Sequence, residues 1–414
     1  MKQWLKINME KIILVILIIL MILPYSISIF GVAISNIVTI MVGLMFLYFI
    51  STNRKAIRES LNNKFIIFNI LFVITIIFSL ISNFNTIKFN DIYEPIKYVV
   101  FSLIAIMEMI ICKKKENYLY MLKAINITTI IITIFGIIQY FNPFSINEIY
   151  LPFYTTESHY RQLINDYPNP RVIGTKWTPP SWGLLMSLCV YFNILNLQYN
   201  KNKVSSIVAI LLCVINLMMT LTRTNQIAFM ASIVIFILIY VWIKKGWKKA
   251  ISTMLITILL MLILLMVLPE QLTWRLMQIT DLSEVNSWNE RIDKWGGQLS
   301  LLKGDALFGI GPIKNHTETV GYTDSELIQM PLQYGIIGSI VYLMMLCAPI
   351  YAYIKDRSLK NILLFYPPIL VMILIHNISA SSLVFFDTAI GIYILIGLLF
   401  VRIEEKENEE KYNI

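Results

Sequence analysis

The stretch IILVILIILMILPYSISIF, residues 12–30, decides the fold class of this sequence because it is continuously apolar and carries no charge. Its length fits the roughly 20 residues that a helix needs to cross about 30 Å of hydrocarbon. The run is too long for the core of a signal peptide, so we expect it to be retained as a membrane-spanning helix.

Similar runs recur along the chain, each bounded by charged residues. Hydrophobic residues make up 57% of the 414 positions and charged residues 14%, and the mean hydropathy is +0.70. A soluble protein of this composition would expose more apolar surface than water tolerates. We therefore predict an all-α polytopic membrane protein that forms a single integral membrane domain over residues 1–414.

Hydropathy and charge together predict about twelve transmembrane helices with both chain termini in the cytoplasm. Most Lys and Arg residues then fall on the inner side, as the positive-inside rule requires, and an odd number of spans would break this alternation. The expected spans lie at about residues 12–30, 34–50, 65–82, 95–112, 119–140, 181–197, 204–221, 225–243, 250–268, 331–354, 361–378 and 383–401.

The net charge of +9 comes largely from inner clusters such as residues 113–115 and 244–249. These clusters set topology beside anionic lipid, and the chain lacks the contiguous basic soluble face of a nucleic-acid-binding protein. None of the four cysteines falls in an outer loop, so the sequence offers neither a disulfide framework nor a cysteine-based metal site.

Two predicted outer loops, residues 141–180 and 269–330, are long enough to fold, and we expect them to form an ordered extracytoplasmic lid. In the first loop, Thr178 is a plausible helix N-cap and Pro179 suits the first helical position. Arg171 lies just before this helix start. It either extends to lipid headgroups or contributes to a binding site.

The second loop has two capping signals. Residues 287–290 (SWNE) predict a helix start near residue 288, with one apolar face that directs Arg291 inward. Thr323 and Glu326 predict a second, short helix that Pro331 ends before the tenth span. The expected face of the first helix consists of Trp288, Arg291, Ile292, Trp295, Leu299 and Leu302.

One further cation stands out in the sequence. Arg223 lies in a tight turn between the seventh and eighth spans, on the outer side, where a positive charge runs against the positive-inside rule. It is either a surface arginine that reaches the headgroups or a ligand for an anion in a cavity between the spans.

Four segments carry a resemblance to a known family. RVIGTKWTPPSWG (171–183), LTRTNQIAF (221–229), RIDKWGGQLSLLKGDALFGIGP (291–312) and YTDSELIQMPLQYGIIGSIVYL (322–343) follow one another in the order typical of the O-antigen ligase and polymerase superfamily. The resemblance covers roughly residues 165–345 together with the twelve-span plan. Each motif alone is weak, but four in order are fairly specific.

The resemblance implies a membrane glycosyltransferase (GT-C-like) architecture in the cytoplasmic membrane of a bacterium. It implies a polysaccharide polymerase that transfers a glycan from undecaprenyl diphosphate to a sugar hydroxyl of the next lipid-linked unit, with no cofactor, metal ion or nucleotide sugar. Flippase and chain-length regulator proteins are the partners that such an enzyme implies. Asp324 stands where ligases of the group have His, and this departure favours the polymerase branch; Ala306 replaces a Pro of the pattern.

The motif positions give the predicted site. Arg223 and Arg291 are expected to bind the diphosphate, because a guanidinium binds phosphate bidentately and stays charged, with Arg171 as a weaker third ligand. Asp324 either activates the acceptor hydroxyl or caps its helix. Further residues expected to contact substrate or replace Asp324 are Lys176, Trp295, His316, Glu318 and Asp387.

Two other classes stay open at this point. An O-antigen-type ligase would attach the glycan to another acceptor. A lipid-linked oligosaccharide transporter or flippase would also have about twelve spans, although transporters usually carry charges at mid-membrane. A structural scaffold or sensor lacks a soluble inner domain in this sequence. Two long outer loops and few charges at the centres of the spans favour the enzyme.

Overall fold

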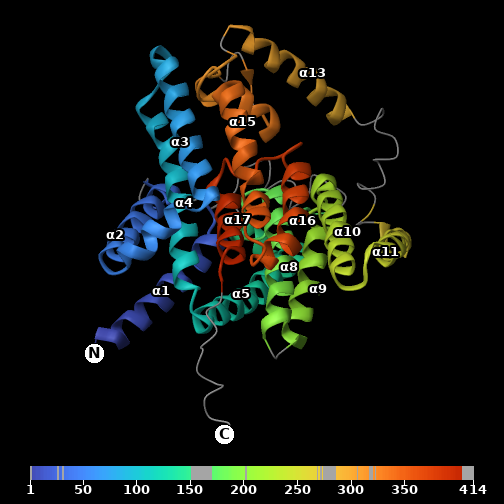
Figure 1. The fold of residues 1–414 in the computed structure, drawn as a ribbon. Coiled ribbons are helices and arrows are strands. Elements are labelled where there is room, and N and C mark those ends of the chain that lie inside the picture. Colours follow the sequence, from blue (N-terminus) through green and yellow to red (C-terminus); the bar gives the residue numbers. More distant parts are fainter. Residues whose placement is uncertain are drawn as a thin grey trace.

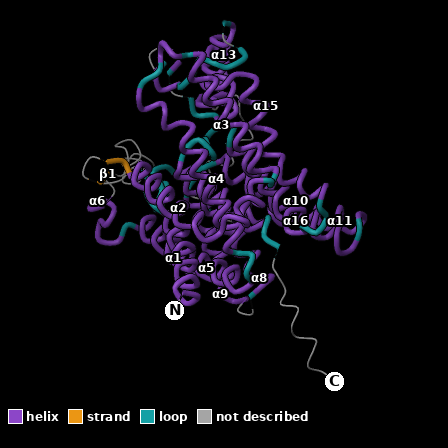
Figure 2. The backbone as a smooth tube through the Cα atoms, turned by 60° about the vertical axis from the view of Figure 1, so that its left-hand side comes forward, coloured by secondary structure: helices purple, strands orange, loops and turns teal. Residues whose placement is uncertain are grey.

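The computed structural model describes most of the chain. The described residues are 2–25, 28–29, 32–150, 170–200, 203–267, 269–270, 273, 286–304, 306–316, 320–321 and 323–402. Within them the protein is helical, apart from one pair of two-residue antiparallel strands, β1 (Ser28–Ile29) and β2 (Val32–Ala33), at the edge of the helical body (Figure 2). The prediction of an all-α polytopic membrane protein is confirmed.

Every one of the expected spans overlaps a helix. These long helices are α1 (Lys2–Ile22), α2 (Ile34–Leu61), α3 (Lys64–Ser82), α4 (Tyr93–Ile111), α5 (Lys115–Phe141), α8 (Pro179–Tyr199), α9 (Lys203–Met219), α10 (Arg223–Lys245), α11 (Trp247–Val267), α15 (Glu326–Lys355), α16 (Lys360–His376) and α17 (Phe386–Leu399).

Length and composition alone qualify six of these helices to cross a membrane, namely α2, α3, α5, α8, α10 and α15. The helices α9, α16 and α17 are apolar but shorter. Some predicted boundaries were wrong. Helix α1 ends at Ile22 and not at residue 30, since Pro24 follows at once, and α2 continues past residue 50 to Leu61 with a kink at Asn53.

Helices α17 and α8 form the centre of the bundle (Figure 1). All residues of α17 are buried, and it contacts α1, α4, α8 and α16. A helix that is apolar all round, as α17 is, has no face suited to water and stabilises the fold by burial on every side. By contrast, α11 contacts α10 and exposes most of its apolar residues, as expected of a helix at the lipid boundary.

Segments predicted to lie on one side of the membrane contact each other in the structure. On the predicted inner side, Lys114 pairs with Glu10 at 2.7 Å, and Arg402 pairs with Asp356. On the predicted outer side, the amide of Asn315 donates to the Asp91 carboxylate at 2.6 Å. These contacts agree with the predicted alternation of the spans, while the cytoplasmic position of the termini stays a prediction.

Shorter elements gather near the predicted outer ends of the spans. The helix α13 (Asn286–Ser300) lies at the far end of the molecule from the start of α1 (Figure 1). The other short elements are η1 (Phe84–Thr86), η2 (Phe89–Ile92), η3 (Pro143–Ser145), α6 (Ile146–Tyr150), η6 (Leu301–Lys303) and η7 (Ile313–Asn315).

A break in α15 holds the end of the second loop. Gly335 has φ +66°, which interrupts the helix, and Gly309 approaches the same backbone with φ +74°. The amide of Ile310 donates to the carbonyl of Leu332 at 2.8 Å, and the amide of Ile336 donates to the carbonyl of Ala306 at 2.9 Å. The loop therefore satisfies backbone groups that the break leaves unpaired, as a helix break at this depth requires.

Candidate functional site

The segment before α8 is fixed by buried hydrogen bonds. The Gln139 side-chain oxygen accepts from the amides of Ile173 and Gly174 at 2.9 and 2.8 Å. Gly174 has φ +56°, and a Cβ there would come within 2.2 Å of the Trp182 ring, so only glycine fits. Thr178 accepts from the Ser181 amide and begins α8, which confirms the predicted cap.

This segment also contacts the turn that carries Arg223. The amide of Val172 donates to the carbonyl of Met219 at 3.1 Å, and the Arg171 side chain donates to the carbonyl of Thr220 at 3.2 Å. The turn itself contains Leu221 at φ +50°, an uncommon conformation for a residue with a branched side chain. Two of the predicted arginines therefore flank one tight turn.

Arg223 is the first residue of α10 and is partly buried. Its neighbours are held firmly: the Thr224 hydroxyl lies 2.6 Å from that of Ser379, and the Asn225 amide donates to the carbonyl of Pro180 at 2.6 Å. Arg223 itself forms no hydrogen bond or ion pair within the described part of the chain. Arg291 lies close enough for its charge to act on the Arg223 guanidinium.

Arg291 is paired with the predicted acid. Its Nε lies 2.6 Å from Oδ2 of Asp324, and the indole nitrogen of Trp295 donates to Oδ1 of the same carboxylate at 3.3 Å. Gln298, one turn further along α13, is buried and donates to the carbonyl of Val320 at 3.0 Å. The structure thus brings together three predicted site residues, one from the segment before α15 and two from α13.

Details of the second loop differ from the prediction. The face of α13 that contacts the protein carries Arg291, Trp295 and Gln298, whereas Ile292 and Leu299 are exposed. The expected face was therefore partly wrong, because polar contacts and not an apolar stripe hold the helix. The side chains of the first capping box, residues 287–290, lie largely outside the described part of the structure.

The second capping box was wrong. The Glu326 side chain does not accept a hydrogen bond from a described residue at the helix start. Its carboxylate is buried and accepts from the Tyr342 hydroxyl at 2.6 Å and from the Leu383 amide at 3.0 Å. The N-cap position is Ser325, and the helix continues through Pro331 to the break at Gly335. Asp324 consequently precedes the cap position, and its carboxylate binds Arg291 and Trp295.

The remaining predicted residues lie apart from this cluster. His316 directs Nε2 to the carbonyl of Ile310 at 2.9 Å, and Glu318 lies outside the described residues. Lys176 is fully buried, 3.3 Å from the Asp387 carboxylate, and donates to the carbonyl of Met21 at 2.8 Å. The structure therefore does not bring Lys176 or His316 to the pair of Arg291 and Asp324.

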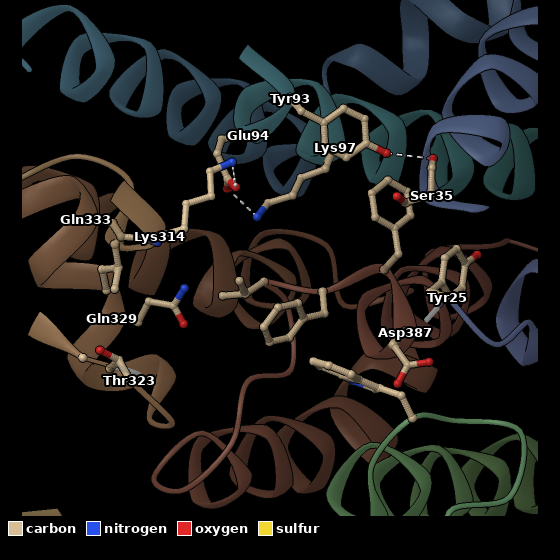
Figure 3. A pocket seen from close by; sticks show the side chains of 16 residues that line it. Tyr25, Ser35, Tyr93, Glu94, Lys97, Lys314, Thr323, Gln329, Gln333 and Asp387 are labelled. Atoms are coloured by element: carbon tan, nitrogen blue, oxygen red, sulfur yellow. Dashed lines mark hydrogen bonds and ion pairs between the residues drawn. The ribbon is translucent and has the colours of Figure 1, made fainter. Parts of the chain in front are cut away.

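Sequence reasoning missed a cavity of about 470 Å³ beside the cluster (Figure 3). It opens between the start of α4, the first half of α15 and residues 383–387, and Thr323, the neighbour of Asp324, lines it. Its charged wall joins segments far apart in the sequence: Lys97 lies 2.5 Å from Glu94, and Lys314 lies 3.8 Å from Glu94. The only sequence signal for this cavity was the pair Glu94 and Lys97, three residues apart at the start of an otherwise apolar helix.

Asp91 anchors this wall from η2. Burial alone would raise the pKa of the Asp91 carboxyl, but hydrogen bonds from Lys314, from the Lys88 amide and from Asn315 lower this pKa below its ordinary value. Asp91 is therefore charged at neutral pH and holds η7 against the start of α4. Among the described residues, no cluster of three or more His, Cys, Asp or Glu side chains could hold a metal ion.

Fold and site together define a polytopic membrane protein with an arginine-rich polar site at one end of its helices. Residues 208–343 match the family model described as O-antigen ligase, a range that includes Arg223, Arg291 and Asp324. This match confirms the resemblance to the O-antigen ligase and polymerase superfamily over residues 208–343 and supports a function of ligase or polymerase type. A search of curated proteins found no match to the chain.

Proposed function

We propose that the protein polymerises lipid-linked oligosaccharide repeat units on the outer face of the bacterial cytoplasmic membrane. It transfers the growing glycan from undecaprenyl diphosphate to a sugar hydroxyl of the next lipid-linked unit. One observation carries the proposal: the Arg223 side chain makes no ion pair or hydrogen bond with a described residue and lies within reach of the charge of Arg291, which is paired with Asp324.

Two guanidinium groups and one carboxylate leave a net positive charge in this region. A diphosphate leaving group develops negative charge on its oxygens, and arginine binds such oxygens through two parallel hydrogen bonds. Preorganised cations near a developing charge act strongly where water is partly excluded. Arg223 and Arg291 thus suit the diphosphate in its departing state, and Arg171 donates a hydrogen bond to the turn that carries Arg223.

The proposed step balances without a further reactant. The acceptor hydroxyl oxygen forms a bond to the anomeric carbon of the donor glycan, and the bond from that carbon to the diphosphate oxygen breaks. The electron pair of the broken bond leaves with undecaprenyl diphosphate. Asp324 accepts the hydroxyl proton once the diphosphate draws the charge of Arg291, and it holds Arg291 in position before that.

A second candidate is the ligase, because the matching family model carries that description. In a ligase the same arginines would bind the donor, but the acceptor would be a different molecule. Asp324 at the motif position where ligases have His favours polymerisation. The family match favours glycosyl transfer over the transporter that the span count alone leaves open.

Electrophoresis of the glycan from a deletion strain tests the proposal. Loss of a polymerase leaves single repeat units on the final acceptor and no long chains. Loss of a ligase leaves long chains on the lipid carrier and none on the final acceptor, an outcome that would overturn polymerisation. Complementation with the wild-type gene, at matched membrane abundance, is the control.

A further inference from the structure

The cavity beside Asp324 has polar atoms that no described residue satisfies. Thr323 and Gln333 both line it and both are more than nine-tenths buried. The Thr323 hydroxyl and the Gln333 side-chain oxygen have no hydrogen-bond partner in the described structure. Buried polar groups are almost always paired, because an unpaired one loses its hydrogen bonds to water without replacement. These atoms therefore point to a ligand that forms hydrogen bonds.

Aromatic rings form much of the remaining wall. Trp177 packs edge-to-face on Phe385 with ring centroids 5.8 Å apart, and Phe386 lies 5.6 Å from the ring of Tyr25 and 5.9 Å from that of Tyr93. All five rings line the cavity. Apolar walls with a few convergent polar groups, in a volume of roughly 300–1,000 Å³, are typical of small-molecule sites. A sugar ring has both an apolar C–H face and hydroxyl groups at its rim, and it matches both features.

The charges around the cavity cancel. Lys97 is paired with Glu94 (Figure 3). Lys314 is paired with Asp91 at 2.9 Å, and the Asp387 carboxylate is paired with Lys176. A charged sugar would have to compete with one of these pairs and leave its partner unpaired in a buried place, which is costly. Hydroxyl groups can instead hydrogen-bond to the paired ions without separating them.

Two consecutive residues connect the cavity to the cluster of Arg291, Trp295 and Asp324. Thr323 lines the cavity, and Asp324 binds Arg291. A sugar in the cavity thus lies beside the carboxylate that, in the proposed function, accepts the hydroxyl proton. Gln329 also lines the cavity from α15, one turn before Gln333.

We infer that this cavity is the acceptor subsite and binds an uncharged, hydroxyl-rich sugar ring of the lipid-linked acceptor. The inference rests on the proposed function, since it assigns the second substrate of that reaction. The Thr323 hydroxyl and the Gln333 amide hydrogen-bond to the sugar, and the Trp177 ring packs on its apolar face.

Binding of a lipid-free probe tests the inference apart from turnover. The probe is the repeat-unit oligosaccharide released by mild acid from the lipid-linked pool of the host cells. Saturation-transfer NMR with the full-length protein in nanodiscs should show the strongest transfer to protons of an uncharged ring. Thr323→Val combined with Gln333→Met keeps the side-chain volumes and should weaken binding at least tenfold.

Thr75→Val is the matched control, because it removes a buried hydroxyl from α3 that bonds only to its own helix, and it should bind as wild type. Unchanged binding by the double variant, or strongest transfer to a charged ring, overturns the inference. Arg223→Gln should lose polymer but retain binding. If wild type binds the probe but forms no polymer, the proposed function fails and the cavity remains a sugar-binding site. If wild type forms polymer and the double variant binds the probe normally, the proposed function stands and only the assignment of the cavity fails.

Discussion

Arg291 Nε lies 2.6 Å from Oδ2 of Asp324, while Trp295, one turn along the same helix, donates to Oδ1 at 3.3 Å. Both oxygens of one partly exposed carboxylate are thereby occupied by α13. This arrangement fixes the position of the arginine relative to α15. In the proposed reaction, Asp324 accepts the proton as Arg291 shifts part of its interaction to the diphosphate.

The first prediction concerns Asp324. Asp324→Asn keeps an acceptor for Trp295 but loses both the charge that holds Arg291 and the basicity, so polymer formation should fall by about a hundredfold, the usual scale for losing a general base. Asp324→Glu should recover part of the activity because it restores charge and basicity. Initial rates at matched membrane abundance measure both effects.

A double-mutant cycle that combines Asp324→Asn with Arg291→Lys tests whether the two residues act as a unit or independently. Residues that act as a unit give strongly non-additive losses. We expect the combined variant to be hardly worse than Asp324→Asn alone. Fully additive losses would show that the pair does not act as a unit, and near-normal activity in Asp324→Asn would remove this carboxylate from the reaction.

The second prediction concerns Arg223. Arg223→Ala removes charge-assisted hydrogen bonds to the diphosphate that contribute about 1.5–3 kcal/mol each, so activity should fall at least tenfold. Because Arg223 holds no described partner, the melting temperature of the purified protein should stay near that of wild type. Arg223→Lys should restore activity only in part, since the planar guanidinium is lost.

Arg357→Ala is the control for this variant. Arg357 lies 4.8 Å from the Tyr353 ring centroid, beyond the end of α15 and on the opposite side of the predicted membrane. Its loss should leave activity unchanged. Equal activity of the Arg223 and Arg357 alanine variants would contradict a diphosphate role for Arg223.

The helices and the site candidates Arg223, Arg291 and Asp324 were both predicted from the sequence, but for different reasons. Apolar run length determines whether a helix can span, so each expected span overlaps a helix. Arg223, Arg291 and Asp324 were reached through motif order. The cavity was not predictable, because Glu94 and Lys314 are more than two hundred residues apart in the sequence and meet only through the packing of η7 against the start of α4.

The third prediction concerns the break in α15. Gly335→Ala places a side chain at φ +66° with its Cβ within 2.2 Å of the Leu307 carbonyl oxygen. The strain and the clash should displace the loop at residues 306–310, lower the melting temperature and reduce activity. Gly296→Ala on α13, whose Cβ would meet nothing within 4 Å, should not lower the melting temperature. A Gly335→Ala variant that folds and stays fully active would contradict the role of Gly335 in holding the loop at residues 306–310 against α15.

The sequence placed this break incorrectly. Pro331 was expected to end a short helix, yet the helix continues through it and changes direction at Gly335. A proline removes one donor but keeps helical φ, whereas a glycine at positive φ reverses the local chain. The backbone conformation of Gly335 in the structure shows that this residue, and not Pro331, breaks the helix.

The fourth prediction concerns pH. The lowered pKa of Asp91 in the folded state contributes stability above its unfolded pKa of about 3.9, and this contribution is lost as pH falls through the folded pKa. Asp91→Asn should therefore melt below wild type at pH 7, and the gap should close in strong acid. A gap that stays constant between pH 7 and pH 3 would show that the charge of Asp91 does not matter.

Turnover in vesicles that contain only the purified protein and radiolabelled undecaprenyl-diphosphate-linked repeat units tests polymerisation directly. Wild type should give a ladder of lipid-linked products spaced by one repeat unit, and Arg223→Ala should give a strongly reduced ladder. Products that appear only when a different acceptor is added, or no glycan transfer at all with intact substrate, would contradict polymerisation.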